Sequence, residues 1–291
     1  MKKRLIVIVS ILAFLAVAAL VSCLMSRWWL VVRSWTVTSD RIQQGFDAVV
    51  ISDLHGERFG KDNEKLIRRI QELDPDVIIM AGDMIGDDDS SDEELCALIK
   101  ELTETAPVYY GYGNREIAYM EAGEDRETTF PQHLKEAGAI VLEKEFADVP
   151  AGSEMIRIGG MYEYAFGLDD KNSVASLAEP EKSFLTQFES TDSFRLMISH
   201  RSDSYIFGDA SSYWNIDLVV SGHIHGGQVV LPFAGGLYGA DQGFFPKYVH
   251  GLYNKDNIQL FVTSGLGSQK EIFPRMNNRP EIALLHIRSE G

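Results

Sequence analysis

The sequence predicts an α/β protein with a parallel sheet, preceded by a single membrane-spanning helix. Three observations support this prediction. An apolar, charge-free stretch stands near the amino end, apolar runs of strand length alternate with helical patterns as far as residue 112, and short polar motifs directly follow several of these runs. Alternating strands and helices favour a parallel sheet, and the loops at the carboxyl ends of its strands meet in one crevice.

The amino end has the pattern of a membrane helix. Residues 5–25 carry no charged side chain and follow the bases at residues 2–4. A helix of this length spans the roughly 30 Å of a hydrocarbon core and is longer than the apolar core of a cleaved signal peptide. Trp28, Trp29 and Trp35 are expected to form an interfacial belt. Because Lys and Arg favour the cytoplasmic side, we expect a single-pass anchor in the cell membrane with the rest of the chain outside the cytoplasm.

A lipid anchor is the alternative at this end. Leu20-Val21-Ser22-Cys23 resembles a bacterial lipobox, in which Cys23 would be lipidated after cleavage. Both interpretations attach the protein to a membrane. The other cysteine, Cys96, falls in a predicted helix, so the sequence contains no disulfide framework.

The chain is acidic, with a net charge of −16, and three of its bases lie in the membrane end. An acidic body repels phosphate polymers unless a local cationic patch or metal ions intervene, so we expect no nucleic-acid partner. The length suits one large α/β domain with a membrane segment, and the sequence does not indicate an oligomeric state. The predicted organisation is a membrane anchor at 1–26, a juxtamembrane linker at 27–45 and a folded domain at 46–291.

The amino half supplies strands and helices in alternation. A short edge strand is expected at 35–38 in the linker, and apolar residues at helical spacing predict a helix over 66–73 that Pro75 ends. A second helix is expected to start at Ser91, where Ser91-Asp92-Glu93-Glu94 would form a capping box. The expected buried strands of this half are 48–51, 77–80 and 108–110.

The carboxyl half is richer in strands. A short helix is expected at 132–137, where Gly138 ends it. The predicted strands that follow are 155–158, 196–198, 218–220, 228–231, 260–263 and 282–287. In the two halves together, five of the buried strands stand before a polar motif.

These polar motifs contain the residue types that bind a divalent metal. Carboxylate and amide oxygens mixed with imidazoles suit Mn, Fe or Zn, whereas structural zinc sites are rich in Cys. Satisfied histidines and turn aspartates explain any single motif, but not five motifs in this order. The motifs are Asp53-Leu54-His55, Gly82-Asp83, Gly113-Asn114-Arg115-Glu116, His200 and Gly222-His223-Ile224-His225.

The order of the motifs resembles that of the calcineurin-like metallophosphoesterases over about residues 46–291. The sequences at 221–228, 243–248 and 278–282 are similar to the membrane-associated branch of that family, which carries a Gly-His-x-His-Gly-Gly-Gln signature. The resemblance implies two packed mixed β-sheets flanked by helices, and two divalent metal ions (Mn, Fe or Zn). The implied ligands are Asp53, His55 and His225 for one metal, Asn114, His200 and His223 for the other, and Asp83 for both.

The function that the resemblance implies is metal-dependent hydrolysis of a phosphorylated substrate. In such a site a hydroxide that bridges the two metals attacks a phosphodiester or a pyrophosphate in line. Asn114, Arg115 and His223 are the residues expected to take part in catalysis. Glu116 or Ser199 is expected to orient the imidazoles by hydrogen bonds.

Arg115 departs from the family pattern, in which a His usually follows the Gly-Asn pair and protonates the leaving group or binds the phosphate. Arg keeps its proton but can bind a phosphate oxygen through two N–H groups. We therefore expect phosphoanhydrides or activated diesters, whose leaving groups need little protonation. The UDP-diacylglucosamine pyrophosphatases of this superfamily also have Arg here. Sequence drift at a tolerant position is the alternative.

The membrane anchor favours a lipid-linked substrate near a bilayer. One alternative is an extracytoplasmic phosphatase or phosphodiesterase that acts on small soluble substrates. Another is a catalytically weak, metal-binding interaction module. The complete ligand set favours an enzyme, because binding alone does not require Asp83 beside Asn114.

Overall fold

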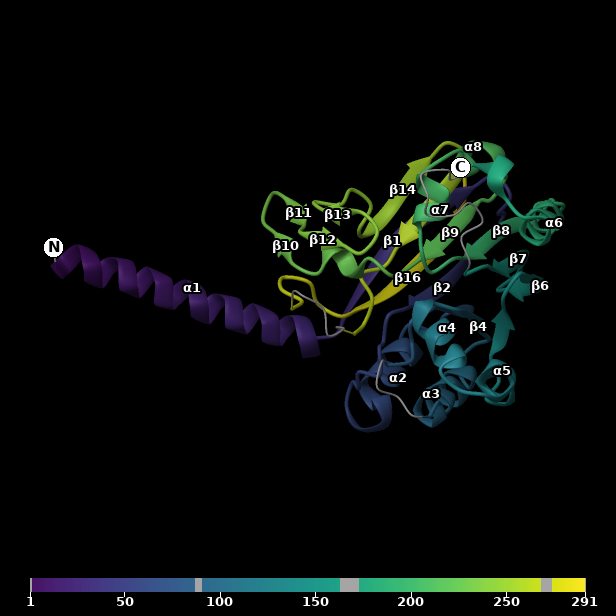
Figure 1. Ribbon diagram of the computed structural model, residues 1–291. Coiled ribbons are helices and arrows are strands. Elements are labelled where there is room, and N and C mark those ends of the chain that lie inside the picture. Colours follow the sequence, from purple (N-terminus) through teal and green to yellow (C-terminus); the bar gives the residue numbers. More distant parts are fainter. Residues whose placement is uncertain (1, 87–90, 163–172, 268–273, 291) are drawn as a thin grey trace.

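The computed structural model describes residues 2–86, 91–162, 173–267 and 274–290 (Figure 1). A long helix, α1 (Lys2–Trp28), projects from a body that contains two six-stranded sheets. The sheets pack face to face, and helices cover the outer face of each. This arrangement confirms the predicted α/β fold with two packed mixed sheets flanked by helices.

The first sheet has the strand order β1–β16–β2–β3–β4–β5. Its strands β2 to β5 are parallel, whereas β16 is antiparallel to β2 and parallel to β1. Strand β3 and residues 48–51 of β2 are continuous apolar runs, as expected for strands with both faces covered. The strands are β1 (Val31–Ser39), β2 (Phe46–Ile51), β3 (Val77–Ala81), β4 (Val108–Gly111), β5 (Ile140–Leu142) and β16 (Glu281–Ser289).

The second sheet has the order β14–β15–β9–β8–β7–β6. Its four inner strands are parallel, and the two edge strands, β14 and β6, are antiparallel to their neighbours. The strands are β6 (Glu145–Ala151), β7 (Glu154–Gly160), β8 (Phe194–Ile198), β9 (Leu218–Ser221), β14 (Gly251–Lys255) and β15 (Ile258–Val262). Between β9 and β14 lie two short hairpins, β10 (Val230–Leu231) with β11 (Gly235–Gly236), and β12 (Tyr238–Gly239) with β13 (Gly243–Phe244).

Helices bury their apolar faces against the outer side of each sheet. The helices on the first sheet are α2 (Glu64–Gln71), α3 (Glu93–Thr103), α4 (Asn114–Glu121) and α5 (Arg126–Glu136). Those on the second sheet are α6 (Glu179–Phe188), α7 (Asp203–Ile206) and α8 (Ala210–Tyr213). The short 3-10 turns are η1 (Lys61–Asn63), η2 (Val174–Ser176) and η3 (His225–Gly227).

Two helix starts differ from the prediction. α3 begins at Glu93, and its N-cap residue Asp92 makes no capping hydrogen bond. The Asp92 carboxylate instead lies 2.9 Å from His133 Nδ1 and ties α3 to α5, so the predicted capping box is wrong. α5 begins before Pro131 rather than after it. Burial of Phe130 and Leu134 on either side outweighs the roughly 3 kcal/mol that an internal proline costs.

The segment predicted as a linker contains β1, which is longer than the expected strand at 35–38 and pairs with β16 along its whole length. Trp35 on this strand packs edge-on against the rings of His250 and Phe261, at centroid distances of 5.3 and 4.8 Å. The prediction that Trp35 belongs to an interfacial belt is wrong. The alternation of side chains along the strand turns Trp35 toward the second sheet.

In the described part of the chain, α1 is the one helix that is long and apolar enough to cross a membrane. A membrane anchor and a signal sequence both pass this test of length and composition. The last turns of α1 contact the loop before β16. Ser22 Oγ donates to Asn277 Oδ1 at 2.6 Å, and Asn278 N donates to Ser26 Oγ at 3.1 Å.

Candidate metal centre

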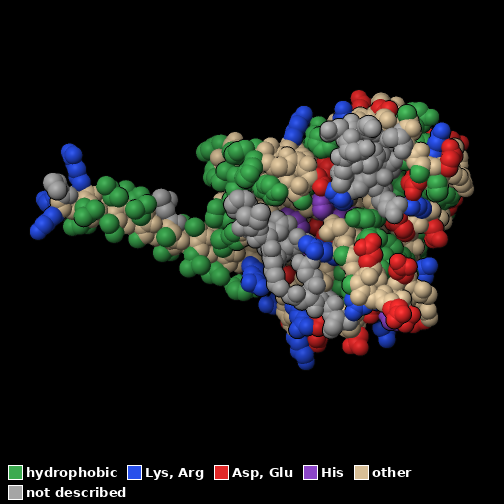
Figure 2. Space-filling model, viewed as in Figure 1, with side chains coloured by type: hydrophobic (Ala, Val, Ile, Leu, Met, Phe, Trp, Pro, Cys, Tyr) green, Lys and Arg blue, Asp and Glu red, His purple; other side chains and the backbone are tan. Residues whose placement is uncertain are grey.

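The loops after five strands converge at the carboxyl ends of the two sheets. Three of these strands, β2, β3 and β4, belong to the first sheet, and two, β8 and β9, belong to the second. Histidine side chains are visible near the middle of the body between the two halves (Figure 2). The candidate ligands on these loops are Asp53, His55, Asp83, Asn114, His200, His223 and His225.

The acidic and imidazole side chains form two adjacent groups. In each group the potential ligand atoms lie within 4.8 Å of one another. The groups also lie close together, because His200 Nε2 is 3.8 Å from Asp53 Oδ1, and His55 Nε2 is 3.8 Å from Asp83 Oδ2. The first group is Asp53, His55 and His225, and the second is Asp83, His200 and His223.

Several buried polar atoms at this site are of a kind that binds cations, and they make no hydrogen bond. Asn114 Oδ1 is one of them, and Asp83 Oδ2 and His200 Nε2 make no hydrogen bond beyond an ion-pair contact with each other at 3.3 Å. Leaving one buried acceptor unsatisfied costs about 1–3 kcal/mol, so several in one place are unusual. Divalent cations would satisfy them, and these oxygen and nitrogen donors fit Mn, Fe or Zn. The residues present therefore fit two metal-binding sites.

Asp53 and Asp83 are poised to remain ionised. Burial by itself would raise the pKa of the Asp53 carboxyl, but the neighbouring His225, His55 and His200 outweigh burial and hold the pKa below its usual range. Burial would raise the pKa of the Asp83 carboxyl as well, but the neighbouring His200 outweighs burial and lowers this pKa. Two anionic carboxylates in a buried crevice attract a cation.

The imidazoles differ in protonation. Burial lowers the pKa of His225 to about 3 and also lowers the pKa of His223, so both rings are neutral at pH 7. Burial would lower the pKa of His200 too, but the Asp83 and Asp53 carboxylates raise it to about 10. A metal that binds His200 must therefore displace a proton, which makes binding weaker in acid.

The backbone is strained where the candidate ligands lie. Five of them have a positive φ, a conformation that non-glycine residues rarely adopt and that costs about 1–3 kcal/mol each. Such strain persists where the surrounding structure enforces it, as at binding sites. The residues are Asp53 (54°), His55 (50°), Asp83 (53°), His223 (69°) and His225 (48°).

Glycines allow the loops to approach the ligands closely. A Cβ atom at Gly113 would lie 2.5 Å from the Asp83 nitrogen and closer still to Asp83 Oδ1. A Cβ atom at Gly222 would clash with Ser52 Oγ and Asp53 Oδ2. The candidate ligands Asp83 and Asp53, together with Ser52, occupy the space that these side chains would fill.

Glu116 holds the loops in place rather than orienting an imidazole. Its fully buried carboxylate accepts hydrogen bonds from the backbone N–H groups of Asp83 (2.8 Å), Met84 (2.8 Å) and Gly113 (2.7 Å). The expectation that Glu116 or Ser199 orients the rings is therefore wrong for Glu116. His200 is oriented by a backbone group, because its Nδ1 lies 2.7 Å from the Ala81 carbonyl oxygen.

A second polar network, which the sequence did not predict, contacts His223. Asp241 Oδ2 lies 2.9 Å from His223 Nε2, and Arg201 Nε donates to the same oxygen at 2.9 Å. Burial together with the neighbouring Asp241 raises the pKa of Asp203 to about 8. One feature of the sequence could have drawn attention to Asp241: it is the one charged residue in the glycine-rich stretch between residues 226 and 246.

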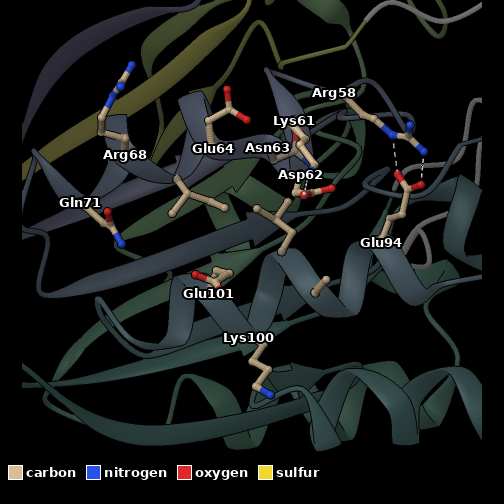
Figure 3. A pocket seen from close by; sticks show the side chains of 13 residues that line it. Arg58, Lys61, Asp62, Asn63, Glu64, Arg68, Gln71, Glu94, Lys100 and Glu101 are labelled. Atoms are coloured by element: carbon tan, nitrogen blue, oxygen red, sulfur yellow. Dashed lines mark hydrogen bonds and ion pairs between the residues drawn. The ribbon is translucent and has the colours of Figure 1, made fainter.

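A groove elsewhere on the body lacks these features. It has a volume of about 740 Å³, lies beside α2 and α3, and is lined mainly by exposed polar side chains (Figure 3). Arg58 and Glu94 form an ion pair across one end of it. None of the candidate ligands lines this groove, so it is separate from the metal centre.

A family model described as calcineurin-like phosphoesterase matches residues 47–227. The chain therefore belongs to the calcineurin-like phosphoesterase family, which confirms the resemblance at the level of the family. The class of protein is a metal-dependent phosphoester hydrolase.

Three bacterial relatives are similar to the chain over most of its length. An uncharacterised metallophosphoesterase of Campylobacter jejuni is 27% identical over 81% of this chain, which spans only 58% of that longer protein. The uncharacterised metallophosphoesterase YkuE of Bacillus subtilis is 26% identical, and the alignment covers 87% of this chain and 84% of YkuE. The phosphodiesterase YaeI of Escherichia coli is 25% identical, with coverage of 83% and 82%.

Proposed function

We propose that this chain is a membrane-anchored phosphohydrolase that binds two divalent cations and cleaves a phosphodiester or a pyrophosphate. The position of Asp83 supports this most strongly, because its Oδ2 lies 3.3 Å from His200 Nε2 and 3.8 Å from His55 Nε2. Asp83 thus stands between the two groups, where one carboxylate can serve both cations. When bound, two such cations neutralise phosphate charge and supply a nucleophile at neutral pH.

The assignment of ligands follows the two groups. We assign Asp53, His55 and His225 to one cation, and Asn114, His200 and His223 to the other, with Asp83 shared. Asn114 is the first residue of α4, directly after Gly113, which packs against Asp83. Its neutral oxygen adds no negative charge to the second site.

Arg115 is assigned to the phosphate. It follows Asn114 on α4, and its backbone N–H donates to Asp83 Oδ1 at 2.8 Å, so its side chain starts at the edge of the centre. A guanidinium can neutralise the transition state but cannot protonate a leaving group. Asn114, Arg115 and His223 thus form the catalytic set, which suits anhydrides and activated diesters.

The membrane location belongs to the same proposal. Residues 1–26 act as the anchor, 27–45 as the connection and 46–291 as the catalytic domain, placed outside the cytoplasm. The relative in E. coli is described as a phosphodiesterase, which agrees with a diester substrate. A lipid-linked substrate follows from the anchor. Turnover of small soluble diesters alone would favour the soluble-substrate alternative.

The Asp83→Asn variant tests the shared carboxylate. Asn keeps the oxygen that accepts from Arg115 N, so the fold should persist while the charge is lost. We expect the variant to lose at least one of two metal ions, and its turnover of an aryl phosphodiester to fall roughly 10³-fold. Metal analysis and steady-state kinetics measure both effects.

Asp62→Asn is the matched control, because Asp62 has a similar φ of 51° but an exposed side chain. It should retain metal and activity. A parent that binds two metals but hydrolyses no phosphoester would favour the interaction module. An Asp83→Asn variant with full metal content and full activity would refute the proposed site.

The Arg115→His variant tests the leaving-group argument. The parent should hydrolyse an aryl phosphodiester much faster than an alkyl one. The His variant can protonate an alkoxide leaving group. We therefore expect the ratio of aryl to alkyl phosphodiester turnover to fall about 10²-fold. Arg115→Lys is the control, because it keeps the charge but loses the bidentate contact. A parent that cleaves both esters equally fast would contradict this role.

A further inference from the structure

The segment that follows the candidate ligands exposes an apolar surface. Residues 226–240 contain no charged side chain, and they form the hairpin of β10 and β11 and the start of the next hairpin. Phe233 at the tip of the first hairpin is fully exposed, and Phe244 and Phe245 are 63% and 61% exposed. Soluble surfaces rarely present several exposed aromatic side chains together, and such patches mark contact sites.

This apolar surface, residues 231–245, lies on the side of the body from which α1 projects (Figure 1). Asn277 connects the two. Its Nδ2 donates to the Val230 carbonyl oxygen at 3.1 Å, its Oδ1 accepts from Ser22 Oγ at 2.6 Å, and its N–H donates to Ser22 Oγ at 2.9 Å. β10 therefore starts beside a residue of α1.

The position of Ser22 along α1 indicates how deep Asn277 and β10 would lie relative to a bilayer. Ser22 belongs to the charge-free run at residues 5–25 and lies about 5 Å before its end, at about 1.5 Å per residue. If this run occupies the hydrocarbon core, then Asn277 and β10 are level with its boundary, and the exposed tip at Phe233 needs no movement of the body to reach lipid. Lipidation of Cys23 would place acyl chains at the same level.

Basic side chains surround the base of α1 on another side. A cavity of about 500 Å³ is lined by Lys65, Arg68 and Arg69 of α2 together with apolar residues that include Met25 and Trp28. Bases also gather where α1 meets the body in Figure 2. In a chain of net charge −16, this local excess of bases suits the anionic headgroups at a membrane surface.

We propose that the exposed aromatic side chains of the apolar surface, Phe233, Phe244 and Phe245, insert into the same leaflet from which α1 emerges, while Lys65, Arg68 and Arg69 contact lipid headgroups. The ligand of this surface is the lipid bilayer, and the inference rests on the proposed membrane location. The apolar surface begins six residues after His225 and contains Asp241, which contacts His223. Its insertion fixes the rim of the metal centre at the bilayer, so that a substrate embedded in lipid presents its phosphate without leaving the membrane.

Spin labels on the full-length protein in anionic nanodiscs test this proposal. In a background with Cys23→Ser and Cys96→Ala, single cysteines are placed at Phe233, at Val21 in α1 and at Met155. Met155 is also an exposed apolar residue, and its strand β7 lies on the side of the body away from α1 (Figure 1). Collisions with oxygen, which concentrates in lipid, are compared with collisions with a water-soluble nickel chelate. Each variant must retain its metal content and aryl phosphodiester turnover.

We expect the labels at 233 and 21 to collide more with oxygen, and the label at 155 to collide more with nickel. A label at 233 that behaves like 155, while 21 reports lipid, would overturn the inference and leave the membrane anchor intact. A label at 233 shielded from both reagents would show coverage by protein and would also overturn it. A label at 21 in water would overturn the membrane location itself.

Discussion

The Glu116 side chain shows how a buried carboxylate can build a metal site without binding a metal. Besides the backbone N–H groups of Asp83, Met84, Ile85 and Gly113, it accepts from the Tyr110 hydroxyl at 2.8 Å. Every one of these groups donates, so an acceptor-only carboxylate satisfies them all. Such supporting residues usually affect metal affinity 10–100-fold.

The Glu116→Gln variant should therefore weaken metal binding without replacing any ligand. Its amide N–H₂ would face backbone donors and leave at least one of them unsatisfied, at a cost of about 1–3 kcal/mol. We expect metal affinity to fall about 10–100-fold in calorimetric titrations, and the protein to unfold at a lower temperature.

Glu121→Gln, an exposed change on the same helix, is the control and should alter neither quantity. If Glu116→Gln bound metal as tightly as the parent, then the loops would owe their position to other contacts.

At the scale of elements, the centre depends on how closely α4 approaches the loop after β3. Gly113 precedes α4 in an extended conformation with φ of −114°, so its importance is steric and does not arise from backbone freedom. Any side chain there meets Asp83, whose backbone is fixed by Glu116.

Gly113→Ala should therefore displace Asp83 and reduce metal content and activity, while the helices and strands persist. Circular dichroism, metal analysis and phosphodiester turnover would show this combination. Gly123→Ala, just beyond the other end of α4, is the matched control, because the atoms nearest to its Cβ would belong to the flexible side chain of Arg126. Equal activity in the two variants would contradict the close-approach argument.

The sequence predicted the elements whose pattern is local. Continuous apolar runs identify β2 and β3, and the polar motif after each run shows which end of the strand faces the crevice. It could not predict contacts between distant segments. The pairing of β1 with β16 joins residues about 250 positions apart, and so it turned an expected linker into a sheet edge and turned Trp35 inward.

The site residues that the sequence did not predict also depend on contacts between distant segments. The candidate ligands stand in recognisable motifs, but Asp241 lies alone in a loop and gains its role only because folding brings it to His223. The local sequence likewise placed Asp92 in a capping box, but in the fold its carboxylate contacts His133 on another helix. The partition into two ligand groups came from the family resemblance, since spacing in the sequence does not define distances.

At the scale of the whole molecule, basic residues and the exposed apolar surface lie at the end of the body that α1 joins. The body is acidic, yet bases and apolar residues gather where α1 meets the body (Figure 2). The loop that carries His223 and His225 continues along the chain into the apolar surface. The proposed enzyme would thus work with its metal centre close to the membrane and its acidic surface in water. The proposed activity depends on two cations for which Asp83 would be a shared ligand.

Anomalous diffraction from crystals of the manganese-loaded protein tests that claim most directly. We expect two manganese peaks about 3.5–4 Å apart, with one Asp83 oxygen near each. One group of ligands should be Asp53, His55 and His225, and the other Asn114, His200 and His223. A single peak, or two peaks with no shared Asp83, would contradict the account.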